Sequence, residues 1–224
     1  PVKIPAFYSM PKGFGRPWPE VHSGEVLLEG GYDAPVQVVE RLMAVSREEE
    51  FPGVYVYDLG QEMAGGPRIC LHGKAGTEIT VRYAEVRYPD LLEYSGREGT
   101  LMMENYRDAT STDIYICHGG EGEVYQPRFT FHGFRYIELS GEFSSPPECG
   151  DVVGVVIHSD MAQTGTFECS DPLAGRLWSN LNWGQRGNYF EVPTDCPQRD
   201  ERLGWLGDAQ IFVRTDAYNR NIAA

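Results

Sequence analysis

The hydrophobic period of this 224-residue sequence changes near residue 165, and that change constrains the fold more than any other feature. Before it, short runs rich in Val, Ile, Tyr and Phe alternate with Gly-containing turns, as strands do. In the run "EITVRYAEV", Ile79, Val81 and Tyr83 fall on one face, and Thr80 and Arg82 on the other. This alternation is typical of a half-buried antiparallel strand. Comparable runs occupy residues 25–29, 54–59, 68–72, 78–86, 113–118, 123–131, 134–140 and 152–158.

Many short strands without an intervening helix predict a mainly β fold, an antiparallel β-sandwich of the jelly-roll type. We expect this sandwich domain to occupy residues 50–165. Residues 1–49 contain a connector rich in Pro and Gly, and we interpret them as a linker with edge strands.

After residue 165 the apolar residues follow a helical spacing. The first helix is expected from the stripe formed by Leu173, Leu177, Trp178 and Leu181, which recurs at the period of an amphipathic helix. Asp171 suits the N-cap of this helix and Pro172 its first position. Residues 208–219 predict a second helix, with Asp208 as its cap. Because two helices cannot enclose a core, residues 166–224 are expected to be the N-terminal part of a truncated all-α domain.

Composition excludes several classes of protein. The formal net charge of −14 at pH 7 disfavours a nucleic-acid partner, because phosphate binding requires a basic face. The sequence has no run of about 18 apolar residues, so no membrane span is predicted. An opening without Met and without a charged-then-apolar leader suggests an excised piece. The compartment stays open.

The cysteines do not indicate a disulfide framework or a metal site. They are dispersed and odd in number, so reduced thiols are expected, at Cys70, Cys117, Cys149, Cys169 and Cys196. Cys70 and His72 share one face of a strand, but two ligands do not make a zinc site. His132 is expected to make a structural hydrogen bond. No glycine-rich stretch has the strand–loop–helix context of a nucleotide site, so no cofactor is predicted.

The loop "VPTDCPQRDERLGWLGD" is the segment most suited to chemistry. It gathers carboxylates, guanidinium groups and an aromatic ring at Asp195, Arg199, Asp200, Glu201, Arg202, Trp205 and Asp208. Such a set suits a carbohydrate, whose C–H faces stack on Trp while its hydroxyls bind charged groups. Glycosidic cleavage also needs a protonated carboxylic acid, and residue chemistry alone leaves Asp200 and Glu201 open for that role. An ion-pair network with helix caps is the structural alternative.

Three stretches together resemble the α-L-rhamnosidases of glycoside hydrolase family 78. "DCPQRDERLGWLGDAQ" is similar to the hallmark segment of that family, and residues 57–86 and 125–141 are similar to its β-sandwich. The resemblance implies a jelly-roll domain followed by an (α/α)6 barrel, and inverting hydrolysis of terminal α-L-rhamnose. It also implies that Glu201 is the general acid. Substrate-binding roles are implied for Asp195, Arg199, Trp205 and Asp208, and an ion pair or loop hydrogen bond is the default for Asp200.

Inversion requires a second carboxylate, which in this family comes from a later part of the barrel. We therefore expect the chain to be a fragment that does not hydrolyse rhamnosides by itself. The apolar side chains of its helices are expected to pack on the sandwich, to mediate self-association, or to be poorly ordered. The alternative function is a non-catalytic β-sandwich that binds carbohydrate or supports a neighbouring domain.

Overall fold

The computed structural model describes residues 34–222. The strand expected at 25–29 and most of the expected linker lie outside these residues. The strands are β1 (Val36–Met43), β2 (Ser46–Phe51), β3 (Val54–Leu71), β4 (Glu78–Ala84), β5 (Thr112–Ile116), β6 (Glu123–Tyr125), β7 (His132–Gly141), β8 (Val152–Ser159), β9 (Tyr189–Phe190) and β10 (Val192–Pro193). The helices are α1 (Pro172–Gly187) and α2 (Leu206–Asn219), with short 3-10 turns η1 (Leu92–Tyr94), η2 (Glu104–Tyr106) and η3 (Cys149–Asp151).

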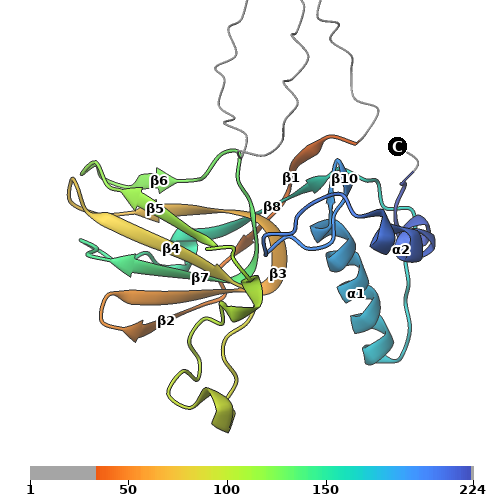
Figure 1. Cartoon of the computed structure of the whole chain (residues 1–224). Helices are drawn as coiled ribbons and strands as arrows, with labels where there is room; N and C mark the ends of the chain where they lie inside the picture. The colour runs from red at the N-terminus through yellow and green to blue at the C-terminus, as the bar shows by residue number, and fades with distance from the viewer. Residues whose placement is uncertain (1–33, 223–224) are drawn as a thin grey trace, which may run out of the picture. The chain divides into compact units, whose positions relative to one another are not determined.

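The strands form an antiparallel, strongly curved sheet in the order β1-β8-β3-β7-β4-β5, with β2 and β6 also paired to β3. The sheet folds over on itself into two layers, and the long strand β3 runs through both of them (Figure 1). Residues 54–58 of β3 pair with β2 and β7, residues 63–65 pair with β7 again, and residues 65–71 pair with β8 and β6. The layers share β3 and enclose the core between them, which confirms the predicted β-sandwich.

One long strand replaces the two that were expected at 54–59 and 68–72. A register shift between Asp58 and Met63 lets β3 bend without ending. Gly65 follows the bend at φ +154°, and a Cβ there would lie 2.0 Å from the Val155 carbonyl oxygen. The glycine that suggested a turn instead allows a close approach between strands.

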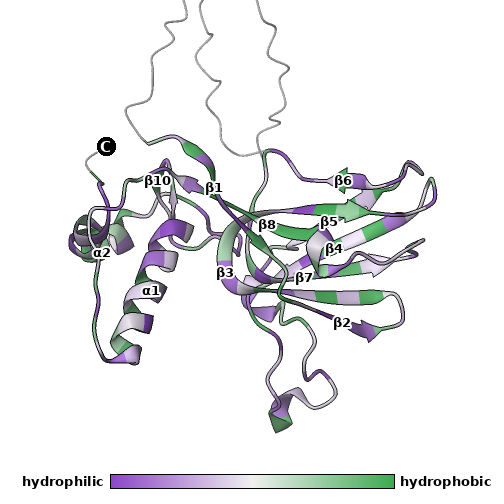
Figure 2. Cartoon of the chain, turned by 180° about the vertical axis from the view of Figure 1, so that it is seen from behind, coloured by the Kyte–Doolittle hydropathy of each residue, from purple (hydrophilic) through white to green (hydrophobic). Residues whose placement is uncertain are grey.

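The core confirms the alternation of β4. Ile79, Val81 and Tyr83 are fully buried, and Figure 2 shows hydrophobic residues spaced along the strands. His132 lies 3.3 Å from Asp113 and stacks on Tyr83, which confirms its structural hydrogen bond. The strand expected at 123–131 is shorter, because β6 ends at Tyr125 two residues before Pro127, and proline cannot donate to the ladder.

The predicted cap of α1 is confirmed, whereas that of α2 is wrong. Asp171 accepts a hydrogen bond from the Leu173 amide at 2.9 Å, and Pro172 opens α1. Helix α2 begins earlier than expected, at Leu206 after Trp205, so Asp208 lies in its first turn and makes no cap. A carboxylate in that turn still interacts favourably with the helix dipole.

Helix α1 packs against β3 and β8, the first of the three outcomes expected for the helical tail. Leu173, Leu177 and Ile211 remain 78%, 61% and 80% exposed. All five cysteines are free thiols. Within the described part of the chain, no helix is long and apolar enough to cross a membrane.

Candidate active-site loop

The charged loop is an ordered structure closed at its neck. Thr194 and Gly204 form an antiparallel bridge, and the Trp205 amide donates to the Pro193 carbonyl at 3.2 Å. The loop thus leaves the β9–β10 hairpin and returns beside it before α2 begins. This closure holds the intervening charged residues close together although they belong to no helix or strand.

The charged loop packs directly on residues of the sandwich. Arg202 donates to the Phe131 carbonyl at 2.7 Å, and its guanidinium lies 5.0 Å from the Phe131 ring centre. Phe131 in turn stacks on Phe190 of β9. At Gly133 of β7, a Cβ would lie 2.8 Å from the ring of Pro197. The backbone of the loop therefore rests directly on the sheet.

Glu201 is held by two guanidinium groups. Arg107, from the sandwich, lies 2.7 Å from Glu201 Oε2, and Arg199, from the loop, lies 2.9 Å from the same oxygen. The Glu201 side chain is 27% exposed, so it is partly shielded and still reachable. Asp200 is exposed and makes no ion pair or side-chain hydrogen bond among residues 34–222, so its expected pairing is not found. This contrast favours Glu201 over Asp200 as the functional carboxyl.

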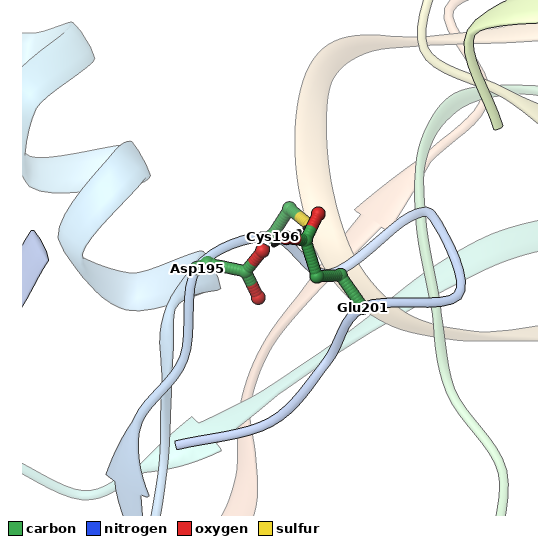
Figure 3. A group of neighbouring side chains, drawn as sticks. All are labelled: Asp195, Cys196 and Glu201. Carbon is green, nitrogen blue, oxygen red and sulfur yellow. Dashed lines mark hydrogen bonds between the residues drawn. The ribbon is translucent and has the colours of Figure 1, made fainter. Parts of the chain in front are cut away.

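Asp195, Cys196 and Glu201 converge, each offering a polar atom within 4.8 Å of the others (Figure 3). The Cys196 thiol donates to Asp195 at 3.1 Å, and Arg199 donates to the Cys196 sulfur at 3.0 Å. Burial raises the pKa of Cys196, which keeps it a thiol. Because Arg107 and Arg199 already pair with these carboxylates, the cluster suits a charge-assisted hydrogen-bond network better than a metal ion.

A cavity of about 370 Å³ lies beside this network, between α1 and α2. Asp195 and Asp208 both line it. Several buried acceptor atoms on its lining residues have no partner among residues 34–222, namely Asp195 Oδ1, Asp216 Oδ1, Gln185 Oε1, Asn188 Oδ1 and Thr194 Oγ1. Buried polar atoms usually have a hydrogen-bond partner, so these atoms require partners beyond residues 34–222.

Asp216 forms the buried wall of this cavity, and sequence reasoning missed it. It is 1% exposed, and the Tyr189 hydroxyl donates to its Oδ2. Burial raises the pKa of Asp216 against the opposing effect of Tyr189. The only sequence signal was an acidic residue inside an expected helix.

The structure brings most of the predicted site residues together. Asp195, Arg199 and Glu201 contact one another, and Asp208 joins Asp195 at the cavity. Trp205 stands at the start of α2 with its side chain 43% exposed. Arg107 was missed, since nothing in its local sequence marks a side chain whose partner lies 94 positions away.

Comparison with known proteins agrees with this architecture. Residues 48–158 match the family described as the bacterial alpha-L-rhamnosidase concanavalin-like domain. Residues 162–224 match the bacterial alpha-L-rhamnosidase 6 hairpin glycosidase domain. These two matches place a concanavalin-like β-sandwich directly before residues of a hairpin glycosidase domain.

Two relatives are alpha-L-rhamnosidases of Streptomyces avermitilis, 46% identical over 191 residues, and of Alteromonas sp., 38% identical over 189 residues. These alignments include 85% and 84% of this chain but only 18% and 20% of the relatives. A solved structure of the Streptomyces enzyme with L-rhamnose superposes with a TM-score of 0.79, over 85% of this chain and 18% of that one. The Dictyoglumus thermophilum enzyme superposes at 0.78 with 39% identity, over 85% of this chain and 21% of that one. The chain belongs to the α-L-rhamnosidases of glycoside hydrolase family 78, and it spans about a fifth of these relatives.

Proposed function

We propose that this chain is part of an enzyme that removes terminal α-L-rhamnose from glycosides or polysaccharides with inversion, and that Glu201 is its general acid. The sandwich ends and the helical catalytic domain begins near residue 165 in this proposal. The observation that carries it is the placement of Glu201, half-buried and bound by Arg107 and Arg199. A carboxyl group so fixed can deliver a proton to a defined position, as the leaving oxygen of a glycoside requires.

The cavity beside the loop supports the substrate roles. Asp195 and Asp208 line it together with buried acceptors that lack partners. In this proposal they accept hydrogen bonds from the rhamnose hydroxyls, and Arg199 holds Asp195 and Glu201 in register. Trp205 offers the exposed flat face on which the apolar side of the sugar stacks.

An inverting reaction also needs a second carboxylate, which acts as the general base. Inverting enzymes hold their two carboxyl groups about 6.5–9.5 Å apart so that a water molecule fits between them. Asp195 has an oxygen within 4.8 Å of Glu201 and belongs to the same short loop, so it does not suit a base on the opposite face of the sugar. We infer that the base lies outside residues 34–222 and that the 224-residue chain alone does not hydrolyse rhamnosides. Turnover by the purified chain would contradict this inference.

The exposed apolar residues of α1 and α2 support a further proposal, that the isolated chain self-associates through these helices. Leu173, Leu177 and Ile211 would be covered by the remainder of a hairpin domain such as the relatives carry. In the isolated chain, burial of each would be worth about 1.5–3 kcal/mol, which favours self-association through these helices. Sedimentation velocity across a concentration series tests this point, and a purely monomeric chain would contradict it.

The decisive experiment uses a protein that carries this chain together with a complete helical domain. The wild type and Glu201→Gln are compared on a rhamnosyl-glucose disaccharide, with the released anomer followed by NMR. The wild type should release the inverted anomer, and the variant should lose about 10²–10⁴-fold in kcat/KM. Asp200→Asn is the matched control and should remain active. Near-normal turnover by Glu201→Gln would disprove the assignment.

A further inference from the structure

Arg107 of the sandwich contacts Glu201 of the charged loop, and the backbone that precedes Arg107 is held rigidly. Arg107 directly follows the turn η2, whose Tyr106 is fully buried and accepts a hydrogen bond from the Glu85 amide at 2.7 Å. Asn105 binds the Glu85 carboxylate at 2.9 Å. The backbone before Arg107 is thus fixed on the sheet by two successive side chains.

Arg107 itself has an unfavourable backbone conformation, with φ at +56°. Residues other than glycine rarely adopt this region, and such strain persists only where the surroundings impose it. The conformation aims the guanidinium at Glu201, although the Arg107 side chain is otherwise 55% exposed.

The contact is specific to one oxygen. Both Arg107 Nη1 and Arg199 Nη2 approach Glu201 Oε2, at 2.7 and 2.9 Å. Guanidinium groups only donate hydrogen bonds, so Oε2 must accept. In the protonated form of Glu201, the proton therefore resides on Oε1.

We propose that Arg107 is a positioning residue supplied by the sandwich to the general acid: it fixes Glu201 so that Oε1 carries and delivers the proton. This inference rests on the proposed function of Glu201. In the step, the Oε1 proton passes to the glycosidic oxygen while the bond from that oxygen to the anomeric carbon breaks. The electron pair of that bond stays with the leaving oxygen, and a water molecule supplies the new bond to carbon and loses its proton to the second carboxylate.

Arg107 contributes more in the transition state than before it. As the proton leaves, Glu201 becomes a carboxylate, and the two guanidinium groups on Oε2 bind the charged form more strongly than the neutral acid. This stabilisation of the transition state by Arg107 matters only when the leaving group needs a proton from Glu201. A poor leaving group such as a sugar needs it, whereas an activated aryl group leaves with little assistance.

Four charged or polar groups surround Glu201. Arg107 approaches from the sandwich, and Arg199, Asp195 and Cys196 belong to the same loop. Because Arg199 also binds Asp195 and Cys196, its removal would disturb the whole loop. Among residues 34–222, removal of Arg107 takes away only its contact with Glu201, so it is the cleaner probe.

The test uses the protein with a complete helical domain and compares Arg107→Ala and Arg107→Lys with the wild type. Each is assayed on a rhamnosyl-glucose disaccharide and on a nitrophenyl rhamnoside. Arg107→Ala should lower kcat/KM for the disaccharide about tenfold or more, mostly through kcat, with the aryl substrate changed by less than about threefold. Arg107→Lys, which keeps one donor and the charge, should recover part of the loss.

The matched control is Arg47→Ala, which breaks another ion pair of the sandwich, with Glu148 at 2.8 Å, and should leave both rates unchanged. Far-ultraviolet circular dichroism and the Tm establish that each variant is folded. Equal losses on both substrates, or no loss on the disaccharide, would overturn the role of Arg107.

Glu201→Gln, alone and combined with Arg107→Ala, separates this inference from the proposed function. If Glu201→Gln lowers disaccharide turnover by about 10²–10⁴-fold, Arg107→Ala should add little in that background, because it acts through Glu201. An additive loss would overturn the inference and leave the acid in place. An active Glu201→Gln enzyme would instead disprove the proposed function, and the inference with it.

Discussion

Arg186 of α1 lies 2.6 Å from Glu40 of β1, a contact that joins the first helix to the edge of the sandwich across 146 positions of sequence. The same guanidinium donates to His158 of β8 at 3.0 Å and lies 4.0 Å from the Trp183 ring centre. His158 can accept because its other ring nitrogen lies 2.7 Å from the Ser159 carbonyl, and burial lowers its pKa, which favours the neutral ring. One side chain thus bridges both parts of the described chain.

Replacement of Arg186 by Ala should lower the free energy of unfolding of the chain by about 1–2 kcal/mol, because a buried His158 nitrogen loses its donor while Glu40 is partly solvated. Urea denaturation followed by tryptophan fluorescence measures the change. Arg176→Ala, on an exposed position of the same helix, is the control and should change stability by less than about 0.5 kcal/mol. Equal effects of the two variants would argue against the bridge.

Gly133→Ala should displace the charged loop. The new methyl group would lie 2.8 Å from Pro197 and 2.9 Å from the Gln198 amide nitrogen, too close for either to remain in place. We expect a loss of about 1–3 kcal/mol in stability and weaker binding of L-rhamnose by the protein with a complete helical domain. Calorimetry measures both quantities. Gly150→Ala, where a Cβ would meet no atom within 4 Å, should change neither, and an unaffected Gly133→Ala would contradict the packing.

The cap of α1 should be worth about 1 kcal/mol. Asp171→Ala removes the acceptor of the Leu173 amide, whereas Asp171→Asn keeps a suitable oxygen. Thermal unfolding should therefore show a lower Tm for the alanine variant and a nearly unchanged one for asparagine. If the two variants lose equal stability, the carboxylate acts through charge and not as a cap.

Glu85 should make the chain less stable as pH rises. Burial, together with the neighbouring Glu62 carboxylate, raises the pKa of Glu85 to about 8. Between about pH 4.5 and 8, the folded chain keeps a proton that the unfolded chain releases, so the free energy of unfolding falls through this window.

Glu85→Gln cannot ionise and should remove that slope. The advantage of the variant over the wild type should therefore grow with pH, by at most about 1.4 kcal/mol per pH unit. Denaturation at pH 5, 6.5 and 8 measures the difference, with Glu93→Gln on the exposed turn η1 as control. Parallel pH profiles of Glu85→Gln and the wild type would be incompatible with a raised pKa.

Some predictions from sequence succeeded because they depend on local geometry. The alternation of Ile79, Val81 and Tyr83 follows from the pleat of a strand, and the start of α1 follows from an aspartate followed by a proline. The charged loop that contains Glu201 and Asp195 could also be identified from the sequence, because carboxylates, guanidinium groups and an aromatic ring lie close together along the chain there.

Other features were decided by the tertiary structure. Gly65 reads locally as a turn, yet it lies inside a continuous β3 because a neighbouring strand approaches there. The local sequence predicts Asp208 as a helix cap. The bridge between Thr194 and Gly204 closes the loop just before Leu206, where α2 begins, so Asp208 lies within the first turn of the helix.

The sequence by itself determined the alternation along β4, the start of α1 and the gathering of charged groups in one loop, because backbone periodicity and side-chain chemistry act over a few residues. Only the tertiary structure decided which groups meet. Arg107 reaches Glu201, 94 positions away, because the order of strand pairing carries the end of η2 to the charged loop. That order depends on burial of the whole core and leaves no local trace around Arg107.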